Sequence, residues 1–169
     1  MHHNYSAYVS DDQRKDHYMS RNITLSCIDV PWFGMLHVAN VHLSWTHHGF
    51  FDEYRRLKQL IDSRRHFGIR AELMVGDFNA PAGEQAYHHI VGHAEYVDQF
   101  YELHPHRFYE PSFRGQIDGW QHSPPKRIDH IFKRNGHPMR VKSMDVIFND
   151  GFYPTVSDHF GYLARFHLF

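Results

Sequence analysis

The sequence contains only one cysteine, Cys27, in its 169 residues. A disulfide within the chain is therefore impossible, and so is a zinc site with four cysteine ligands. No apolar run approaches the ~18 residues of a membrane-spanning helix, and Met1–Asp12 lacks the basic and then apolar pattern of a signal peptide. We therefore expect a cytoplasmic protein without a membrane segment.

The chain also lacks an excess of charge, because its 18 Lys and Arg residues nearly match its 19 Asp and Glu residues. A formal net charge of -1 provides no broad basic field for a nucleic-acid backbone, although it does not exclude a local basic groove. Histidine, in contrast, is abundant, since its 18 residues equal the Lys and Arg total. Because imidazole titrates near pH ~6.5, the charge of the protein should change steeply below neutrality.

Length and composition favour one domain with a substantial core, since 41% of the residues are hydrophobic and 16% are aromatic. We expect a single domain over residues 1–169, in which the polar segment 1–21 is a loop, an edge strand or a docked arm. Residues 93–125 are rich in aromatic and turn-forming residues, and no helix or strand is predicted there.

Apolar periodicity predicts that strands alternate with helices in the rest of the chain. Strands are expected at 23–30, 35–45, 71–75, 127–133, 141–148 and 160–169, and helices at 52–67 and 84–91. The strand 35–45 is apolar on both faces and should be deeply buried. Gly68 and Gly92 are expected to end the two helices. This order indicates a layered α/β (α+β) protein with a mixed sheet.

Four short polar stretches lie beside or just after the predicted strands. They are Asn40-Val41-His42-Leu43, Gly76-Asp77-Phe78-Asn79, Arg127-Ile128-Asp129-His130 and Ser157-Asp158-His159-Phe160. Because side chains from separate strands converge where strands end, a polar site can form there. Asp77, Asn79 and Asp158 offer hard oxygen donors of the kind that Mg²⁺ or Mn²⁺ binds. His42 and His159 suit proton transfer near neutral pH.

Each stretch also has a purely structural interpretation. An Asp-Phe-Asn sequence after a strand often forms a turn in which the side chains bond the local backbone. His42 in a buried strand is equally consistent with a core histidine. Asp129 within an apolar strand is different, because a buried carboxylate needs a partner, and histidine is the obvious type. The order and spacing of the four stretches therefore carry more weight than any one of them.

In this order the four stretches resemble the endonuclease/exonuclease/phosphatase (DNase I-like) superfamily, from about Ile23 to the C-terminus. Three further stretches are similar to a bacterial branch that includes maltose 6'-phosphate phosphatases. These are Asn79-Ala80-Pro81-Ala82-Gly83 with Tyr87, Ile117-Asp118-Gly119-Trp120, and Val156-Ser157-Asp158-His159-Phe160-Gly161. The resemblance implies part of a four-layer α/β/β/α sandwich that lacks its N-terminal strands, and a metal-dependent phosphoester hydrolase.

The resemblance also implies a role for each matching residue. Asp77 and Asn79 would orient the attacking water and hold the phosphate or the metal. His159 would be the base or the transition-state partner, and His42 would hydrogen-bond a phosphoryl oxygen or protonate the leaving group. Asp129 would fix the orientation and tautomer of an imidazole, as the third member of a catalytic triad does.

The metal site implied by the resemblance is incomplete in this sequence. Asp158 would bind Mg²⁺ or Mn²⁺, but the superfamily places an asparagine and then a metal-binding glutamate before the histidine motif. The first glutamate here is Glu53, which follows His42. The available substitutes are Asn4, Asn22, Asp11, Asp12, Asp16 and Asp29. We therefore expect weak Mg²⁺ binding, since one charged ligand fewer removes much of such a site.

Three explanations of the short N-terminal part stay open. The chain is a fragment of an active enzyme, an intact protein that rebuilds the missing layer with another chain, or a non-catalytic remnant that serves as an interaction module. Missing strands would leave a sheet edge and an apolar face uncovered, which favours formation of a homo-oligomer.

A small phosphorylated sugar is the substrate that the sequence favours, because the near-neutral charge and the phosphatase branch agree. Trp120 could stack on a sugar ring, and Lys126 with Arg127 could meet a phosphate. Ordinary packing of Trp120 and a solvated start of a strand at Lys126 and Arg127 are the alternatives. The arginine-rich helix predicted at 52–67 keeps a nuclease or phosphodiesterase as a second hypothesis, although a solvated helix face is favoured.

Overall fold

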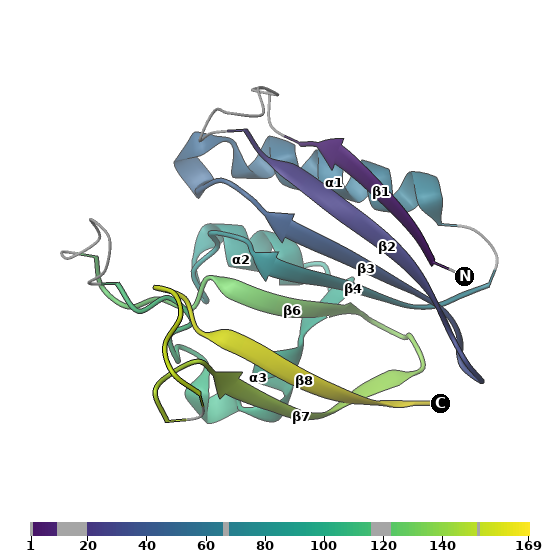
Figure 1. Cartoon of the computed structure of the whole chain (residues 1–169). Coiled ribbons are helices and arrows are strands. Elements are labelled where there is room, and N and C mark those ends of the chain that lie inside the picture. Colours follow the sequence, from purple (N-terminus) through teal and green to yellow (C-terminus); the bar gives the residue numbers. More distant parts are fainter. Residues whose placement is uncertain (1, 10–19, 66–67, 116–122, 152) are drawn as a thin grey trace.

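Six strands form one mixed sheet, in the order β1-β2-β3-β4-β6-β5, in the computed structural model of the chain (Figure 1). The structure describes residues 2–9, 20–65, 68–115, 123–151 and 153–169. The strands are β1 (His2–Tyr8), β2 (Asn22–Val30), β3 (Gly34–His42), β4 (Ile69–Asp77), β5 (Tyr96–Asp98) and β6 (Asp129–Arg134). β3 and β4 run parallel, and the other neighbouring pairs are antiparallel.

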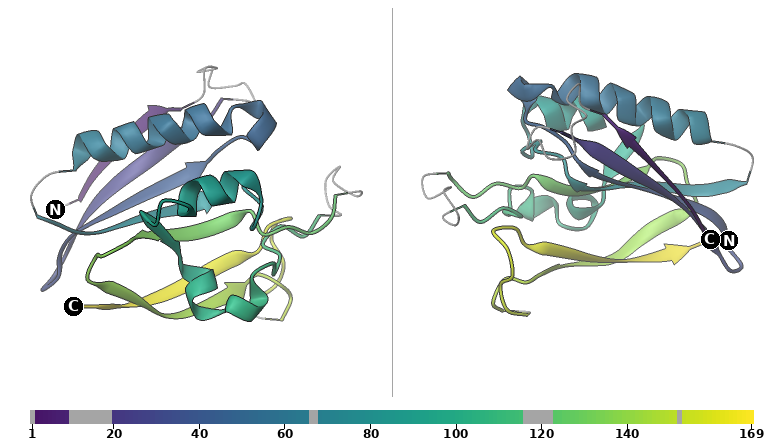
Figure 2. Two further views of the ribbon diagram at one scale, coloured as in Figure 1. Left: turned by 180° about the vertical axis from the view of Figure 1, so that it is seen from behind. Right: turned by 45° about the horizontal axis from the view of Figure 1, so that its top comes forward.

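A second, two-stranded antiparallel sheet contains β7 (Met139–Ile147) and β8 (Gly161–Leu168). The helices are η1 (Thr46–His48), α1 (Phe50–Arg64), α2 (Gln85–Val91), α3 (Gln99–Leu103) and η2 (Pro105–Arg107). α1 and α2 cover one face of the large sheet, and β7 and β8 lie against the other face (Figure 2). This mixed α+β arrangement confirms the predicted fold class. No helix in the described part of the chain is long and apolar enough to cross a membrane.

The core lies between the large sheet and α1. Ile23 and Leu25 of β2 are fully buried and share a cluster with Leu57 and Ile61 of α1. The helical spacing of the apolar residues in α1 places them on the face that meets the sheet. Burying one such side chain contributes roughly 1.5–3 kcal/mol to the free energy of unfolding. The contact between the large sheet and α1 therefore supplies a large part of the stability of the fold.

Two predicted element boundaries are wrong for identifiable reasons. α1 ends at Arg64 instead of residue 67, because Arg65 adopts an extended backbone and its guanidinium binds the buried Glu72 over 3.1 Å. Gly68 therefore lies beyond the end of the helix, whereas Gly92 ends α2 as predicted. The strand predicted to reach residue 45 ends at His42.

The described part of segment 93–125, which omits residues 116–122, contains three elements that the sequence did not predict. They are β5, α3 and η2, each five residues long or shorter. Asp98 starts α3, because its carboxylate accepts hydrogen bonds from the backbone N–H groups of Phe100 and Tyr101. The Phe100 side chain is fully buried beside Val141 and Met144 of β7. Tertiary packing and one cap therefore stabilise a helix that is too short to show periodicity.

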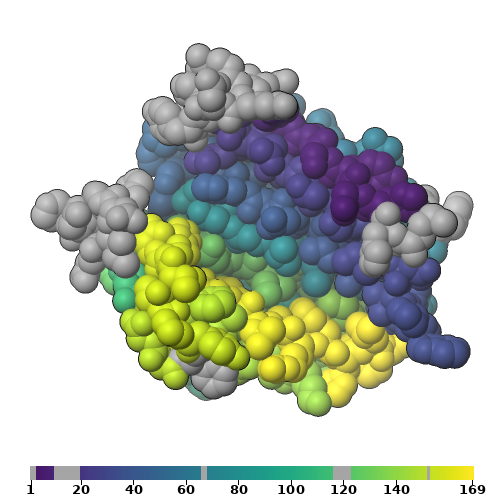
Figure 3. Space-filling view, in the orientation of Figure 1, coloured from purple at the N-terminus to yellow at the C-terminus, as the bar shows by residue number. Residues whose placement is uncertain are grey.

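β1 shows that the polar N-terminal segment supplies an edge strand, one of the three alternatives left open. The register places Ser6 beside Thr24, and Thr24 beside Asn40. Asn4 and Ser26 form the neighbouring pair on the same face. Figure 3 shows that β7 and β8 leave this part of the sheet uncovered. Polar residues of β1 and β2 therefore lie on this uncovered part of the sheet, with Val38 of β3 beside Ser26. The expected deep burial of the 35–45 strand on both faces is wrong, because Asn40 and His42 are exposed.

A buried polar cluster supports β6 from the helix side. Arg127 and Asp98, both about fully buried, form an ion pair with Nη2 and Oδ2 2.7 Å apart. Arg127 Nη1 lies 3.0 Å from Nδ1 of His130, and Nε2 of His130 lies 2.8 Å from the carbonyl oxygen of Ala80. This pattern requires a neutral His130 imidazole that accepts at Nδ1 and donates at Nε2. Burial and the charge of Arg127 lower the pKa of His130 to about 4.

The His130 environment predicts a loss of stability in mild acid. The unfolded chain binds a proton at this imidazole near pH ~6.5, and the folded chain binds it only near pH 4. The free energy of unfolding should therefore fall as the pH drops from 6.5 to 4, by up to roughly 3 kcal/mol from this residue. Urea unfolding across this range measures the effect.

Two variants separate this effect from the other histidines. His130→Asn should be less stable at neutral pH and should show a smaller pH slope, by about one proton. His93→Asn, at an exposed position, should keep the slope of the unaltered protein. An unchanged slope in His130→Asn would show that this imidazole titrates normally in the folded chain.

Candidate active site

Three polar residues lie in one row across the sheet. The register places His42 of β3 beside Asp77 of β4, and Asp77 beside Asp129 of β6. This row lies where β3 and β4 end and β6 begins (Figure 1). His159 comes from the segment just before β8. The convergence that strand-end reasoning predicts is therefore present in the structure.

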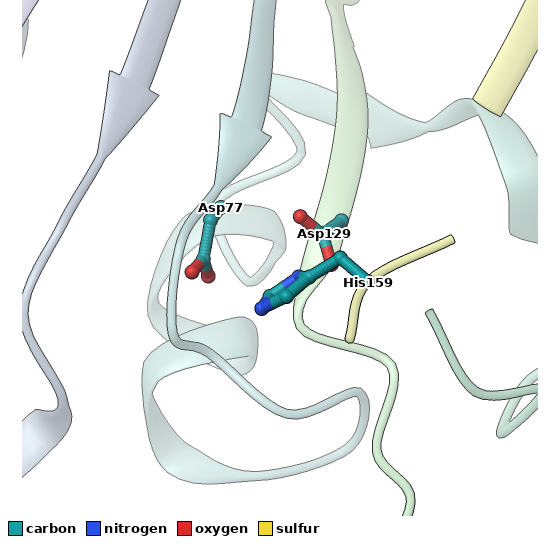
Figure 4. A group of neighbouring side chains, drawn as sticks. All are labelled: Asp77, Asp129 and His159. Atoms are coloured by element: carbon teal, nitrogen blue, oxygen red, sulfur yellow. The ribbon is translucent and has the colours of Figure 1, made fainter. Parts of the chain in front are cut away.

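The side chains of Asp77, Asp129 and His159 point toward one another (Figure 4). One ligand atom of each lies within 4.8 Å of the other two. Nδ1 of His159 lies 2.8 Å from Oδ2 of Asp129, and Nε2 of His42 lies 3.4 Å from Oδ2 of Asp77. Asp129 therefore orients the His159 imidazole through Nδ1, which leaves Nε2 for chemistry in the cleft.

Ser112 holds Asp129 in place, and no motif in the sequence indicates this role. Its hydroxyl donates to Oδ2 of Asp129 over 2.8 Å and accepts from the backbone N–H groups of Ile128 and Asp129. Ser112 is fully buried. Only the need of a half-buried carboxylate for a second donor could have suggested such a residue.

Electrostatics separates the protonation behaviour of the three central groups. Burial and the like charge of Asp129 raise the pKa of Asp77 to about 7. Partial burial and the charge of Arg21 lower the pKa of His42 to about 4, so this imidazole is neutral at pH 7. The hydrogen bond that Nδ1 of His159 donates to Asp129 raises the pKa of His159. The site thus places a neutral imidazole opposite one that takes up a proton more readily.

Asn79 connects the ends of β3 and β4. Its side-chain amide donates to the carbonyl oxygen of Leu43 over 2.7 Å, and its backbone N–H donates to Oδ1 of Asp77 over 2.8 Å. Its φ of 47° lies in the left-handed region, which asparagine tolerates. The local turn that the sequence allowed is therefore present, and the same turn positions Asp77 at the site.

A cavity of about 420 Å³ contains most of the predicted site residues. The lining residues are Arg21, His42, Trp45, Asp77, Asn79, Phe113, Ile128, Asp158 and His159. Arg21, Trp45 and Phe113 are additions that the sequence did not single out, because they belong to no motif. The hydroxyl of Ser157 donates to Oδ1 of Asp158 over 3.1 Å.

The predicted substrate-binding residues lie in different places. Lys126 is at the rim, with Nζ 5.4 Å from the ring centre of Trp45 and 3.9 Å from Glu84. Arg127 does not reach the cavity, because its side chain is fully buried and paired with Asp98. Trp120 lies outside the described residues, as does its motif 117–120.

The suggested substitutes for the missing glutamate do not reach the cavity either. Asn4, Asn22 and Asp29 are described, and none of them lines it. Asp11, Asp12 and Asp16 lie outside the described residues.

The donor set fits a divalent cation. One ligand atom from each of two carboxylates and one imidazole lies within 4.8 Å of the other two, and Asp158 lines the same cavity. Burial and, after it, repulsion from the Asp129 carboxylate raise the pKa of Asp77, and a bound cation would relieve the repulsion. Oxygen donors of this kind suit Mg²⁺ or Mn²⁺, and the carboxylates of Asp77, Asp129 and Asp158 are the groups that would hold it.

No protein-family model matches this sequence, and no curated protein sequence matches it. Solved structures match nearly the whole chain. An endonuclease/exonuclease/phosphatase family protein from Leptotrichia buccalis C-1013-b is 20% identical, with a TM-score of 0.73 over 98% of this chain and 61% of that one. A mannosyl-6-phosphatase from Bacteroides thetaiotaomicron is 18% identical, with a TM-score of 0.68 over 98% of this chain and 66% of that one.

A third similar structure is TDP2 from D. rerio, complexed with a single-strand DNA product. It is 19% identical, with a TM-score of 0.66 over 96% of this chain and 67% of that one. At these identities the comparisons establish the fold, and they confirm the DNase I-like fold that the motifs implied. The chain thus has the fold of endonuclease/exonuclease/phosphatase family proteins and spans 61% to 67% of the length of these three.

Proposed function

We propose that the chain carries the hydrolytic residues of a phosphoesterase. The enzyme would cleave a small phosphorylated sugar by in-line attack of water. The observation that carries this proposal is the row of His42, Asp77 and Asp129, completed by His159 at the wall of one cavity. A phosphate ester needs a positioned water, groups that move protons, and positive charge near the phosphoryl oxygens. Each of these needs has a residue in the cavity.

Each residue of the site has a separate role in the proposed hydrolysis. Asp77 accepts a hydrogen bond from the attacking water and points it at phosphorus. His159, held at Nδ1 by Asp129, takes the water proton at Nε2 as the new P–O bond forms. Neutral His42 hydrogen-bonds a phosphoryl oxygen on the other side of Asp77. The ester P–O bond breaks, the leaving oxygen takes a proton from solvent water, and the sugar leaves as its alcohol, while His159 returns its proton to solvent. A bound Mg²⁺ or Mn²⁺ would offset the charge that develops on phosphate.

A sugar phosphate is favoured over a nucleic acid by the balanced charge of the chain. The mannosyl-6-phosphatase among the similar structures supports the same class of substrate. TDP2 with its single-strand DNA product supports the alternative, a nuclease or phosphodiesterase. The chain spans 61% of the length of the first similar structure, so completion of the site by a missing N-terminal half or by a second copy of the chain is also part of this proposal. A cytoplasmic location stays a prediction.

Phosphate release tests the proposed reaction. The chain is incubated with maltose 6'-phosphate and other sugar phosphates, with and without Mg²⁺ or Mn²⁺, beside a plasmid-nicking assay. Asp158→Ala should abolish release, and His159→Gln should slow it by at least ~100-fold, because general-base catalysis is lost. Asp145→Ala, on the exposed part of β7, is the matched control and should keep full activity.

The outcomes separate the alternatives. Nicking without phosphate release would favour the nuclease. Release that survives Asp158→Ala would show that the site assignment is wrong.

Metal binding by the isolated chain should be weak. The described site offers fewer acidic ligands than the resemblance requires, so the Kd for Mg²⁺ should be on the order of millimolar. Titration with Mn²⁺, followed by water proton relaxation, measures this binding without turnover. Asp77→Asn should weaken it further, and Asp145→Asn should leave it unchanged. Tight, stoichiometric Mg²⁺ binding by the unaltered chain would contradict the account.

A further inference from the structure

Arg21 supplies a permanent positive charge to the cavity. It is the one Arg or Lys among the described residues that line it, and it belongs to none of the four polar stretches. Arg21 lies directly before β2. In the strand order, β2 is on one side of β3, which carries His42, and β6, which carries Asp129, is on the other side. A guanidinium stays charged at every physiological pH, unlike the two imidazoles of the cavity.

The structure fixes Arg21 at both its backbone and its side chain. The backbone N–H of Val9 donates to the carbonyl oxygen of Arg21 over 2.9 Å, and Arg56 donates to the carbonyl oxygen of Val9 over 2.9 Å. Nε of Arg21 donates to Oγ of Ser44 over 3.3 Å. The guanidinium is therefore positioned before any ligand binds, which reduces the entropy lost on binding.

Ser44 is itself held by a buried carboxylate. Its hydroxyl and its backbone N–H donate to the two oxygens of Glu53, over 2.9 and 2.7 Å. Glu53 lies in the first turn of α1 and is almost completely buried. Glu53 of α1 therefore fixes Ser44, and Ser44 in turn fixes the Arg21 side chain at the cavity wall. An ordinary surface arginine lacks such a chain of hydrogen bonds.

The positive charge of Arg21 offsets the repulsion between the carboxylates of the site and an approaching phosphate. Asp77 and Asp158 line the cavity and Asp129 lies beside Asp77, so a phosphate approaching them meets repulsion. Arg21 lines the same cavity as His42 and Asp77, and its charge contributes a lowering of the pKa of both groups. The planar fork of a guanidinium matches two phosphoryl oxygens at once.

We propose that Arg21 binds the phosphoryl group of the substrate and selects for terminal phosphate monoesters, whose two negative charges a fixed guanidinium recognises best. This inference deepens the proposed phosphoesterase function and rests on it. Arg21 holds the phosphoryl oxygens on the side of the cavity away from Asp129, so that phosphorus faces Asp77 and His159.

Binding of inorganic phosphate tests the proposal without any need for turnover. Calorimetric titration is carried out on the whole chain, with and without Mg²⁺. Arg21→Gln should weaken phosphate binding by at least ~10-fold, and Arg21→Lys should recover part of the loss, since the charge returns without the fork. Arg165→Gln removes the same group from an exposed position on β8 and should bind phosphate as the unaltered chain does. Circular dichroism confirms that each variant is folded.

Every outcome bears on the inference. Equal phosphate affinity in Arg21→Gln and the unaltered chain would overturn it, and so would the absence of phosphate binding by the unaltered chain. An equal loss in Arg165→Gln would show a non-specific effect of charge and would also overturn it. Loss confined to Arg21→Gln, without hydrolysis of any ester, would support the inference and contradict the proposed function. Hydrolysis by the unaltered chain, with unchanged phosphate affinity in Arg21→Gln, would overturn the inference and support the proposed function.

Discussion

The register of β4 is the constraint on which the site depends. β4 runs parallel to β3 and antiparallel to β6, so the ends of three strands place Asp77 between His42 and Asp129. A slip of one residue would turn Asp77 to the other face of the sheet. Gly76 helps to fix the register, because its φ is +124° and a Cβ there would lie 2.2 Å from the carbonyl oxygen of Val41. This glycine, which leaves no room for a Cβ between β4 and β3, is thus next to the reactive edge.

Buried polar groups hold the strands that carry this edge. Arg127 connects β6 to Asp98 at the start of α3, and Ser112 connects the start of β6 to the Asp129 carboxylate. Neither role could be predicted from the sequence, because each partner is distant along the chain and only the fold brings the two together. A basic residue next to a motif suggested a phosphate contact for Arg127, but its buried carboxylate partner determines where the side chain lies.

The sequence predicted the elements that show clear periodicity and the residues that follow from strand ends. β2, α2, β7 and β8 lie close to their expected ranges, and the cavity collects His42, Asp77, Asn79, Asp158 and His159. The short elements of segment 93–125 were missed, because tertiary packing and one cap stabilise them instead of local periodicity. Cavity residues outside the polar stretches were missed because only the fold brings them to the site.

The hydrogen bond between Asp129 and His159 is the most direct point at which to test this account, because it joins β6 to the segment before β8 at the reacting centre. Nitrogen-15 NMR of the imidazole, at a pH well above its pKa, identifies the protonated nitrogen. The account predicts a proton on Nδ1, protected from exchange and lost in Asp129→Asn, with Nε2 unprotonated. A proton on Nε2, or a spectrum that Asp129→Asn leaves unchanged, would contradict it.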